Sequence, residues 1–345
     1  MGREVYMHRC LQLARLGAGY TAPNPMVGAV LVKDNKIIGE GWHRLFGQPH
    51  AEVNCIKDAI EKGHTDLSSS TLYVSLEPCA HHGKTPPCTD LIIRHKIPNV
   101  VIGCRDPFAE VNGKGIEQLR VAGIDVQLGI LEQECKHLNK RFFTFHTQQR
   151  PYIILKWAQS DDGVIGSGNN KRLHISNEFT DRLVHKWRSH EAAILVGTNT
   201  ALQDDPSLTN RLWYGATPVR LVLDMDLRLP PSLKLFDGQY PTIVFNAKKE
   251  EATSTLHYYK ISKQRSVVQN LIKAMHELNI LSVLVEGGAR LLQSFIDEGI
   301  WDEAKVIRSQ KIVGEGVAAP RLSRHVIVDT ETLLSDTVTT YKHTV

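Results

Sequence analysis

Cysteine is scarce in this chain, which has six in 345 residues, at positions 10, 55, 79, 88, 104 and 135. So low a density excludes a small scaffold held together by disulfides. No apolar segment typical of a secretory leader follows the first residues. We therefore expect a cytoplasmic protein with reduced thiols. In such a protein, cysteines that lie close in sequence indicate a metal site or catalysis.

Long apolar runs, a strong net charge and an excess of aromatic residues are also missing. The chain has no run of 18 apolar residues, so we expect no membrane span. The formal net charge is only +4, which is too small to indicate nucleic acid as a partner. Hydrophobic residues make up 42% of the chain and charged residues 23%. This ordinary globular composition excludes disorder and collagen-like repeats.

The chain is long enough for about two domains. Each half alternates helical and strand patterns, which predicts an α/β fold. The last helical pattern of the first half runs over residues 131–146, and a polar stretch at 147–151 then interrupts the alternation. We predict one domain over residues 1–147 and a second over residues 150–345.

A candidate metal site lies in the first half. His50-Ala51-Glu52 opens a helical pattern, Cys79 follows a strand pattern, and Cys88 precedes a short helical pattern. One histidine and two cysteines suit zinc, and three protein ligands leave a fourth position for water, as in catalytic zinc sites. Glu52 does not share a helix face with His50 at this spacing. We therefore predict that Glu52 moves protons and does not bind the metal.

The spacing matches the signature of zinc deaminases, in which His-x-Glu is followed by Pro-Cys and a second cysteine. It departs from that signature at one point, because eight residues separate Cys79 from Cys88 where many deaminases have two. His81 and His82 lie in this insertion and are rival ligands. In the alternative interpretation, the two cysteines are core residues and His50 is a surface histidine without a metal.

Several stretches of the first half resemble one family, the bifunctional riboflavin-biosynthesis deaminase–reductases. They are Pro23-Asn24-Pro25-Met26-Val27-Gly28, Gly39-Glu40-Gly41-Trp42-His43, Ser75-Leu76-Glu77-Pro78-Cys79 and Gly83-Lys84-Thr85-Pro86-Pro87-Cys88. The last stretch separates this family from cytidine and transfer-RNA deaminases. The resemblance implies a cytidine-deaminase-like α/β/α domain that holds one zinc ion.

By the same resemblance, four residues of the first domain contact the substrate: Asn24, His43, Lys84 and Asp106. A lysine suits a phosphorylated ribose, and an asparagine can hydrogen-bond a pyrimidine or ribose edge. Without a substrate, Lys84 would be a solvated loop lysine and Asn24 a turn residue. The family often has asparagine where Phe108 stands here. Any side-chain contact from that position is therefore unsupported.

Two glycine-containing turns of the second half are candidates for binding a dinucleotide phosphate. Residues 314–319 match Gly-x-Gly-x-x-Ala, but Pro320 follows at once and no amphipathic helix begins there, so we predict a loop. Gly287-Gly288 lies between an apolar strand pattern and a helical pattern, where backbone N–H groups and a helix N-terminus can hold phosphate. Taken alone, this glycine pair fits a tight turn equally well.

The second half resembles the reductase part of the same family through Lys156-x-Ala158-x-Ser160-x-Asp162-Gly163, Asp204-Asp205-Pro206-Ser207-Leu208-Thr209-x-Arg211 and Val285-Glu286-Gly287-Gly288. That reductase is similar to dihydrofolate reductase in fold and uses NADPH. The implied cofactor contacts are Ala158, His174, Thr200, Asp204, Gly287, Gly288, Ala289, Arg290, Leu291 and Leu292. The implied substrate contacts are Lys156, Arg172, Ser176, Arg188, Leu208, Arg211 and Glu286. Among them, Arg188 and Arg211 suit a clamp on a 5′-phosphate.

The chain departs from the family over residues 172–176, where Ser-Lys-Trp-Ile-Thr is common. His174 replaces a tryptophan that would pack on the cofactor. Arg172 replaces a small polar residue near the substrate, and Ser176 replaces a threonine. Arg188 has an alternative interpretation as part of an exposed helix face.

Together these features predict two consecutive steps toward riboflavin. The first is zinc-dependent deamination of 2,5-diamino-6-ribosylamino-4(3H)-pyrimidinone 5′-phosphate. The second is NADPH-dependent reduction of the ribosyl group to ribityl, in which the cofactor carries the hydride and the protein orients the reactants. We expect phosphorylated pyrimidines as ligands and a homo-oligomer, dimer or tetramer, as in the family. We expect neither nucleic acid nor a membrane as a partner.

Three alternatives stay open on the sequence. A nucleic-acid or nucleoside deaminase with an accessory domain predicts a basic stripe with aromatic residues, and the aromatic residues do not cluster in basic segments. A non-catalytic zinc module predicts a closed fourth ligand position. A deaminase with an inactive reductase half follows if the replacement at His174 prevents cofactor binding.

Overall fold

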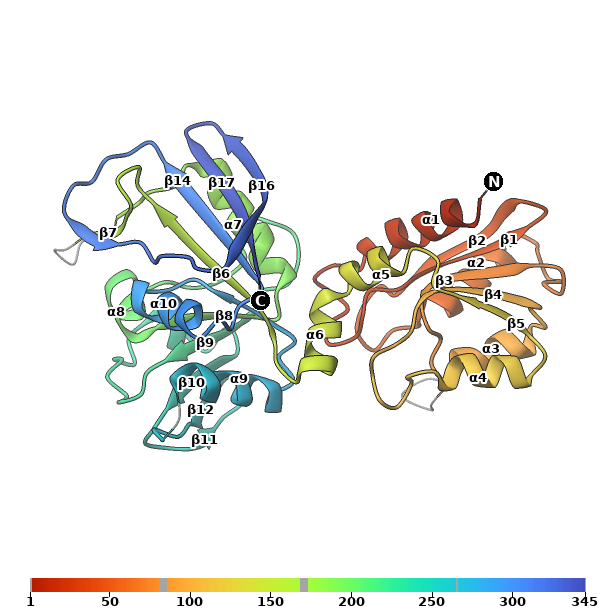
Figure 1. Cartoon of the computed structure of the whole chain (residues 1–345). Helices are drawn as coiled ribbons and strands as arrows, with labels where there is room; N and C mark the ends of the chain where they lie inside the picture. The colour runs from red at the N-terminus through yellow and green to blue at the C-terminus, as the bar shows by residue number, and fades with distance from the viewer. Residues whose placement is uncertain (1, 81–85, 168–172, 265, 345) are drawn as a thin grey trace. The chain divides into compact units, whose positions relative to one another are not determined.

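The structure is a computed structural model that describes residues 2–80, 86–167, 173–264 and 266–344. The chain divides into two compact units, Met1–Gln149 and Arg150–Val345. Both units alternate helices with strands, as Figure 1 shows, which confirms the predicted α/β fold class.

The first unit contains a five-stranded sheet in the order β2-β1-β3-β4-β5. Its strands are β1 (Gly28–Lys33), β2 (Lys36–Trp42), β3 (Thr71–Leu76), β4 (Asn99–Cys104) and β5 (Asp125–Leu128). β1 pairs antiparallel with both β2 and β3, whereas β3, β4 and β5 are parallel. The carboxyl ends of β3 and β4 therefore meet at one edge, and the segments that follow them carry candidate site residues.

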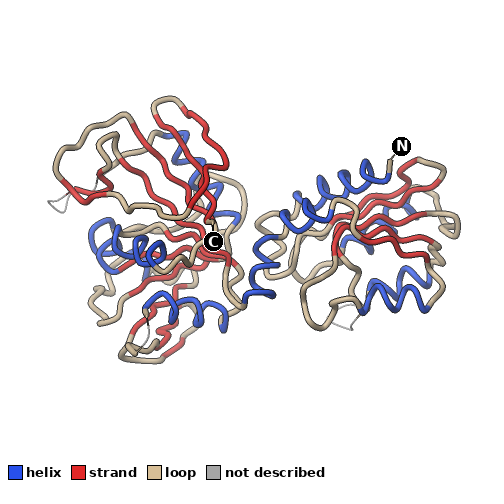
Figure 2. Tube along the Cα trace, viewed as in Figure 1, coloured by secondary structure: helices blue, strands red, loops and turns tan. Residues whose placement is uncertain are grey.

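Helices cover both faces of this sheet (Figure 2). They are α1 (Arg3–Arg15), α2 (Ala51–Glu61), α3 (Cys88–Arg94), α4 (Lys114–Val121), α5 (Glu132–Leu138) and α6 (Lys140–Gln148). One apolar core, which includes Ile56, Ile92 and Leu119, joins α2, α3 and α4 to one face. A second core, which includes Met7 and Cys135, joins α1 and α5 to the other face. The first unit thus has the α/β/α layers implied by the resemblance.

The single helix predicted over residues 131–146 is instead two helices, α5 and α6, with Asn139 between them. Asn139 is buried. Its Oδ1 accepts the Met26 N–H at 2.8 Å, and its Nδ2 donates to the Met26 carbonyl at 2.9 Å. The one-helix prediction was wrong because this contact with a distant segment satisfies the buried amide and interrupts the helical pattern.

The second unit contains a ten-stranded sheet in the order β11-β12-β10-β9-β8-β13-β6-β14-β17-β16. From β12 to β14 in this order, neighbouring strands are parallel, and the outer strands β11, β17 and β16 are antiparallel to their neighbours. The strands are β6 (Tyr152–Gln159), β8 (Ala193–Gly197), β9 (Val219–Leu223), β10 (Thr242–Asn246), β11 (Glu251–Ala252), β12 (Leu256–Lys260), β13 (Ser282–Val285), β14 (Glu303–Ser309), β16 (His325–Leu333) and β17 (Asp336–His343).

The helices of the second unit are α7 (Glu178–His190), α8 (Thr198–Asp204), α9 (Val267–Glu277) and α10 (Ala289–Asp297), with a 3-10 turn at Lys234–Phe236. The largest core of the unit includes Leu271 of α9 and Phe295 of α10. A separate core includes Trp187 of α7. None of the helices within the described ranges is long and apolar enough to cross a membrane.

The segment predicted as a loop at 314–319 contains a short strand, β15 (Gly316–Ala318), which pairs antiparallel with β7 (Val164–Ser167). The prediction was wrong in this detail because pairing with a distant strand, and not any local pattern, creates a strand of three residues. No helix begins at this segment, so its literal glycine motif is not a dinucleotide-binding turn.

Arg220 on β9 is a fully buried charged residue of the second unit. Its guanidinium donates to Thr242, to the Lys234 and Tyr240 carbonyls and to Asp237 at 2.8–3.0 Å. Removing it would take away the donor that these four acceptors share, one of which, Thr242, is buried.

We predict that Arg220→Met lowers the free energy of unfolding of the second unit by about 3 kcal/mol. Urea unfolding followed by tryptophan fluorescence measures this, since Trp157, Trp187, Trp213 and Trp301 lie in the second unit and only Trp42 lies in the first. Arg228→Met, at an exposed position, is the matched control, with a change below about 0.5 kcal/mol. Equal urea midpoints for the two variants would contradict the anchoring role.

Candidate functional site

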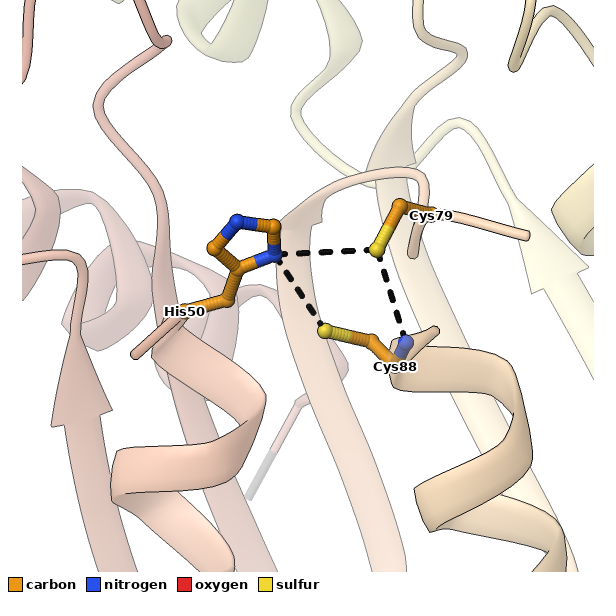
Figure 3. Close-up of side chains that lie close together, drawn as sticks. All are labelled: His50, Cys79 and Cys88. Atoms are coloured by element: carbon orange, nitrogen blue, oxygen red, sulfur yellow. Dashed lines mark hydrogen bonds between the residues drawn. The ribbon is translucent and has the colours of Figure 1, made fainter. Parts of the chain in front are cut away.

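Three elements of the first unit bring one histidine and two cysteines together. His50 is the N-cap of α2, Cys79 follows the end of β3, and Cys88 is the first residue of α3. The His50 Nδ1 lies 3.6 Å from the Cys79 Sγ and 3.4 Å from the Cys88 Sγ, as drawn in Figure 3. The three ligand atoms lie within 4.8 Å of one another. This is the arrangement of a three-ligand metal site.

The chemistry of this donor set fits zinc. Hydrogen bonding from Cys88 and then from His50 lowers the pKa of the Cys79 thiol to about 4, against the opposing effect of burial. A thiolate is the form of cysteine that binds metal. Two sulfurs and one imidazole nitrogen are ligands that zinc prefers, and one coordination position remains for a reacting group.

Glu52 lies in the first turn of α2, two residues after His50, and is 3% exposed. Burial raises the pKa of its carboxyl, and the neighbouring His50 partly opposes this effect. A buried carboxyl next to a metal site, with a pKa raised by burial, is suited to accept and return a proton.

Asn24 and His43 form a polar pair beside His50. The Asn24 Nδ2 donates to the His43 Nε2 at 3.2 Å, and the His43 Nδ1 donates to the Pro49 carbonyl at 3.2 Å. The His43 ring lies edge-on to the His50 ring, with 5.4 Å between the ring centroids. Both nitrogens of His43 are therefore satisfied within the protein, and burial lowers its pKa. The Asn24 side-chain oxygen is the acceptor that this pair leaves available.

Asp106 follows β4 and is buried. Its Oδ1 accepts the Phe108 N–H at 2.8 Å, and burial raises its pKa to about 7. The Phe108 ring packs against His146, with centroids 5.1 Å apart. Lys84, the fourth predicted substrate contact, and the rival ligands His81 and His82 lie outside the described residues.

Glu77 is a functional candidate that the sequence reasoning missed. It is 4% exposed, and its carboxylate accepts backbone N–H groups from four residues: Asp106, Gly113, Gly115 and Ile116. The available signal was an acidic residue directly before Pro78-Cys79, at the end of an otherwise apolar strand.

In the second unit, Lys156 of β6, Arg188 of α7 and Glu286 after β13 form a buried ion network. The Arg188 guanidinium makes two hydrogen bonds of 2.7 Å with the Glu286 carboxylate, and the Lys156 Nζ lies 3.7 Å from the same carboxylate. Burial disfavours a charged Glu286, but Arg188 and Lys156 outweigh it and lower the pKa to about 2. The side chain of Arg188 is 13% exposed, which excludes its interpretation as part of an exposed helix face.

The predicted clamp of two arginines is not symmetric in the structure. Arg188 is engaged by Glu286 and also donates to the Thr209 carbonyl at 3.2 Å. Arg211 is exposed and donates to the Ser207 hydroxyl, while its backbone N–H donates to the His185 Nδ1 at 3.1 Å. His185, a second residue that the sequence reasoning missed, therefore fixes the backbone from which Arg211 extends.

The turn between β13 and α10 fits a dinucleotide phosphate. A Cβ added at Gly287 would lie 3.0 Å from Val196 of the neighbouring strand β8, and Gly288 has a φ of +69° and faces Thr200. Gly288 is the N-cap of α10 and provides no side-chain cap. The N–H groups of Ala289 and Arg290 in the first turn are thus placed to bind an anion.

The remaining predicted cofactor contacts lie on several elements. Thr200 and Asp204 lie on α8, and Ala158 is half-buried on β6. Leu291 and Leu292 are buried in the main core, so only their backbone is available to a cofactor. The His174 side chain is 64% exposed, with its Nε2 3.6 Å from Asp181.

The structure describes two of the three remaining predicted substrate contacts. Leu208 is buried in a separate core and has a φ of +52°. Ser176 donates to Asp181 at 2.6 Å. Arg172 lies outside the described residues.

Both units match known families. The family described as the RibD C-terminal domain matches residues 151–339. The cytidine and deoxycytidylate deaminase zinc-binding region matches residues 2–104. The riboflavin biosynthesis protein RibD of Aquifex aeolicus is 44% identical, over 92% of this chain and 90% of its own length. The RibD protein of Escherichia coli is 35% identical, over 91% of this chain and 89% of its own length.

A solved structure agrees with these matches. The crystal structure of a diaminohydroxyphosphoribosylaminopyrimidine deaminase/5-amino-6-(5-phosphoribosylamino)uracil reductase from Thermotoga maritima is similar with a TM-score of 0.89 and 39% identity. The similarity covers 99% of this chain and 98% of that one. Together with the His/Cys/Cys zinc site, these findings show that the chain belongs to the RibD family of bifunctional riboflavin-biosynthesis enzymes, which join a zinc-dependent deaminase to an NADPH-dependent reductase.

Proposed function

We propose that residues 1–147 deaminate 2,5-diamino-6-ribosylamino-4(3H)-pyrimidinone 5′-phosphate and that residues 150–345 then reduce its ribosyl group to ribityl. The observation that carries the proposal is the buried carboxyl of Glu52 beside the cluster of His50, Cys79 and Cys88. A purely structural zinc site needs no such group, because its ligands close the coordination sphere.

Bound zinc would supply an activated water nucleophile at neutral pH. Glu52 performs the two proton transfers. Its carboxylate takes one proton from the attacking water and gives it to a ring nitrogen as the C–O bond forms. It then takes the second proton from the new hydroxyl and gives it to the amino group, which leaves as ammonia when the C–N bond breaks. Burial raises the pKa of this carboxyl, which makes its carboxylate form a better proton acceptor, as the role requires. His50, Cys79 and Cys88 hold the metal and take no part in the proton transfer.

The side chains around the metal site would orient the substrate. The Asn24 oxygen is free to accept a hydrogen bond from an amino group, since its nitrogen is held by His43. His43 keeps both Asn24 and its own ring fixed beside His50. Asp106 supplies a buried polar group after β4, and Lys84 would meet the 5′-phosphate.

In the reductase unit, NADPH would supply the hydride, which is delivered to C1′ of the ribosylamino group. The turn at Gly287-Gly288 and the start of α10 would hold its phosphates, with Thr200 and Asp204 of α8 beside them. Arg211 is exposed and suited to the 5′-phosphate of the substrate. Lys156 and Glu286, two charged groups of the buried ion network, would lie near the reacting sugar in this assignment.

A homo-oligomer in the cytoplasm is part of the same proposal. Strand β16 is the outer strand of the ten-stranded sheet and is exposed along most of its nine residues. It carries Val326, Ile327 and Val328, which are 49%, 63% and 59% exposed. An edge strand with exposed apolar residues is normally covered, and a second copy of this chain would cover these three.

The two activities can be separated by product mass. With zinc-loaded protein and the diamino precursor, we predict release of ammonia without NADPH and a gain of two hydrogens only when NADPH is added.

Glu52→Gln should lower the deaminase kcat by a factor of at least about 10²–10⁴ and leave the reductase step unchanged. Glu61→Gln, on the exposed end of the same helix, is the control. Full deamination by the Glu52→Gln variant would overturn the proposed mechanism. Deamination without any NADPH oxidation would assign an inactive reductase half.

The stability of the second unit should fall with acid through His185. Burial, followed by Arg188 and Arg211, lowers the pKa of His185 to about 4, below its ordinary value of 6.5. The unfolded chain therefore takes up the proton first as the pH falls, and this contribution to stability is lost between about pH 6.5 and pH 4. His185→Asn keeps an acceptor for the Arg211 N–H without titrating, so we predict a smaller drop of its urea midpoint over this range. Identical pH profiles for the His185→Asn variant and the original chain would rule the role out.

The oligomer has its own test. Ile327→Lys places a charge on the apolar edge of β16, and we predict that it reduces the molar mass measured by light scattering to that of the monomer. Val121→Lys, at an apolar residue that is 84% exposed on α4, should leave the mass of the assembly unchanged. A monomeric original chain, or an Ile327→Lys variant that keeps the full mass, would show that β16 does not mediate assembly.

A further inference from the structure

Helix α4 contacts both of the segments that carry the cysteine ligands, the turn after β3 and the start of α3. At its start, the buried carboxylate of Glu77 accepts the N–H groups of Gly115 at 3.0 Å and Ile116 at 3.3 Å, together with that of the N-cap residue Gly113 at 3.0 Å. These donors and the positive end of the helix stabilise the carboxylate. Since Glu77 stands two residues before Cys79, the start of α4 is tied to the first cysteine turn.

The approach between α4 and this turn is as close as the backbone allows. A Cβ added at Gly115 would lie 2.1 Å from the Pro78 carbonyl oxygen, so no other residue fits at this position without displacing one of them. The backbone of Glu77 is held from the other side, because its N–H donates to the Cys104 carbonyl at the end of β4 at 3.0 Å. The Glu77-Pro78-Cys79 turn is therefore fixed between α4 and the sheet.

One turn further along α4, Gln118 makes the second connection. Its Nε2 donates to the Asp90 Oδ1 at 2.8 Å, and its Oε1 accepts the Thr89 hydroxyl at 2.9 Å. Thr89 and Asp90 directly follow Cys88 on α3. Thr89 is fully buried, and both its N–H and its hydroxyl also contact the Cys79 carbonyl, at 3.3 Å and 3.2 Å. Gln118 thus holds the residues that link one cysteine ligand to the other.

We propose that α4 is a brace that sets the separation of Cys79 and Cys88, with Glu77 and Gln118 as positioning residues for the zinc site. Where only two residues separate the cysteines, as in the usual deaminase signature, the short connection itself limits their distance. Here eight residues intervene, and a connection of that length constrains its ends far less. A separate element must hold the two thiolates at the spacing that zinc requires, and residues behind the ligands commonly set metal affinity.

The inference rests on the zinc centre of the proposed function, and metal binding tests it apart from catalysis. Zinc affinity is measured by competition with a chromophoric chelator. Cobalt substitution then reports the coordination geometry through its absorption bands. We expect Gln118→Ala and Glu77→Gln each to weaken zinc binding by about 10–100-fold and to shift the cobalt spectrum. At saturating zinc, kcat of the deaminase should fall more than KM changes, since neither residue contacts the substrate.

Glu117→Gln is the matched control. It makes the same chemical change as Glu77→Gln, but at an exposed position of α4, next to Gln118. It should bind zinc and cobalt like the original chain. The reductase activity of the same molecules should stay constant in all variants, which separates a local effect from a loss of folding. If Glu77→Gln does not fold, Gln118→Ala decides the question.

Zinc affinity and cobalt spectra equal to those of the original chain in the folded variants would overturn the brace. An original chain that binds zinc without deaminating the precursor would instead remove the proposed substrate. The affinity comparison would then still decide whether α4 sets the ligand spacing.

Discussion

The carboxyl ends of adjacent parallel strands meet at one edge of a sheet, and both candidate sites depend on this constraint. In the first unit, Glu77 and Cys79 follow β3 while Asp106 follows its parallel neighbour β4. In the second unit, Glu286 and the glycine turn follow β13, and α8 follows the adjacent β8. Residues that lie far apart in the sequence are thereby collected without any long-range motif. Their side chains need only the correct register of the sheet.

Two buried glutamates show how the surroundings assign different roles to the same side chain. At Glu52 the neighbouring His50 does not offset burial, so the pKa of the carboxyl rises, as the proposed proton-transfer role requires. The Glu286 side chain is also largely buried but faces Arg188 and Lys156, so its pKa falls and it stays ionised as a fixed negative charge. The pKa values move apart because of neighbouring charges and not because of depth, a general way in which enzymes separate acid–base groups from electrostatic ones.

The zinc ligands and the strands could be predicted from the sequence because their signals are local: a short motif, or an apolar run bounded by turns. Other features depend on partners elsewhere in the chain. Asn139 interrupts a good helical pattern because of Met26, and β15 exists because of β7. Glu77 and His185 accept hydrogen bonds from backbone N–H groups. Because residues of any type provide such groups, no sequence pattern predicts these contacts. The burial of the Leu208 side chain in a core also depends on distant partners and could not be predicted from the motif in which it lies.

The contact of Thr89 with the Cys79 carbonyl has a consequence for how such a protein can diverge. When the geometry of two ligands is maintained from outside the segment that joins them, that segment can change in length and sequence while the ligands stay in place. Lengthening a flexible connection from two residues to eight costs only about 1.2 kcal/mol of closure entropy. An ancestral deaminase could therefore acquire a longer insertion at this point, and with it a residue such as Lys84, without first losing its metal.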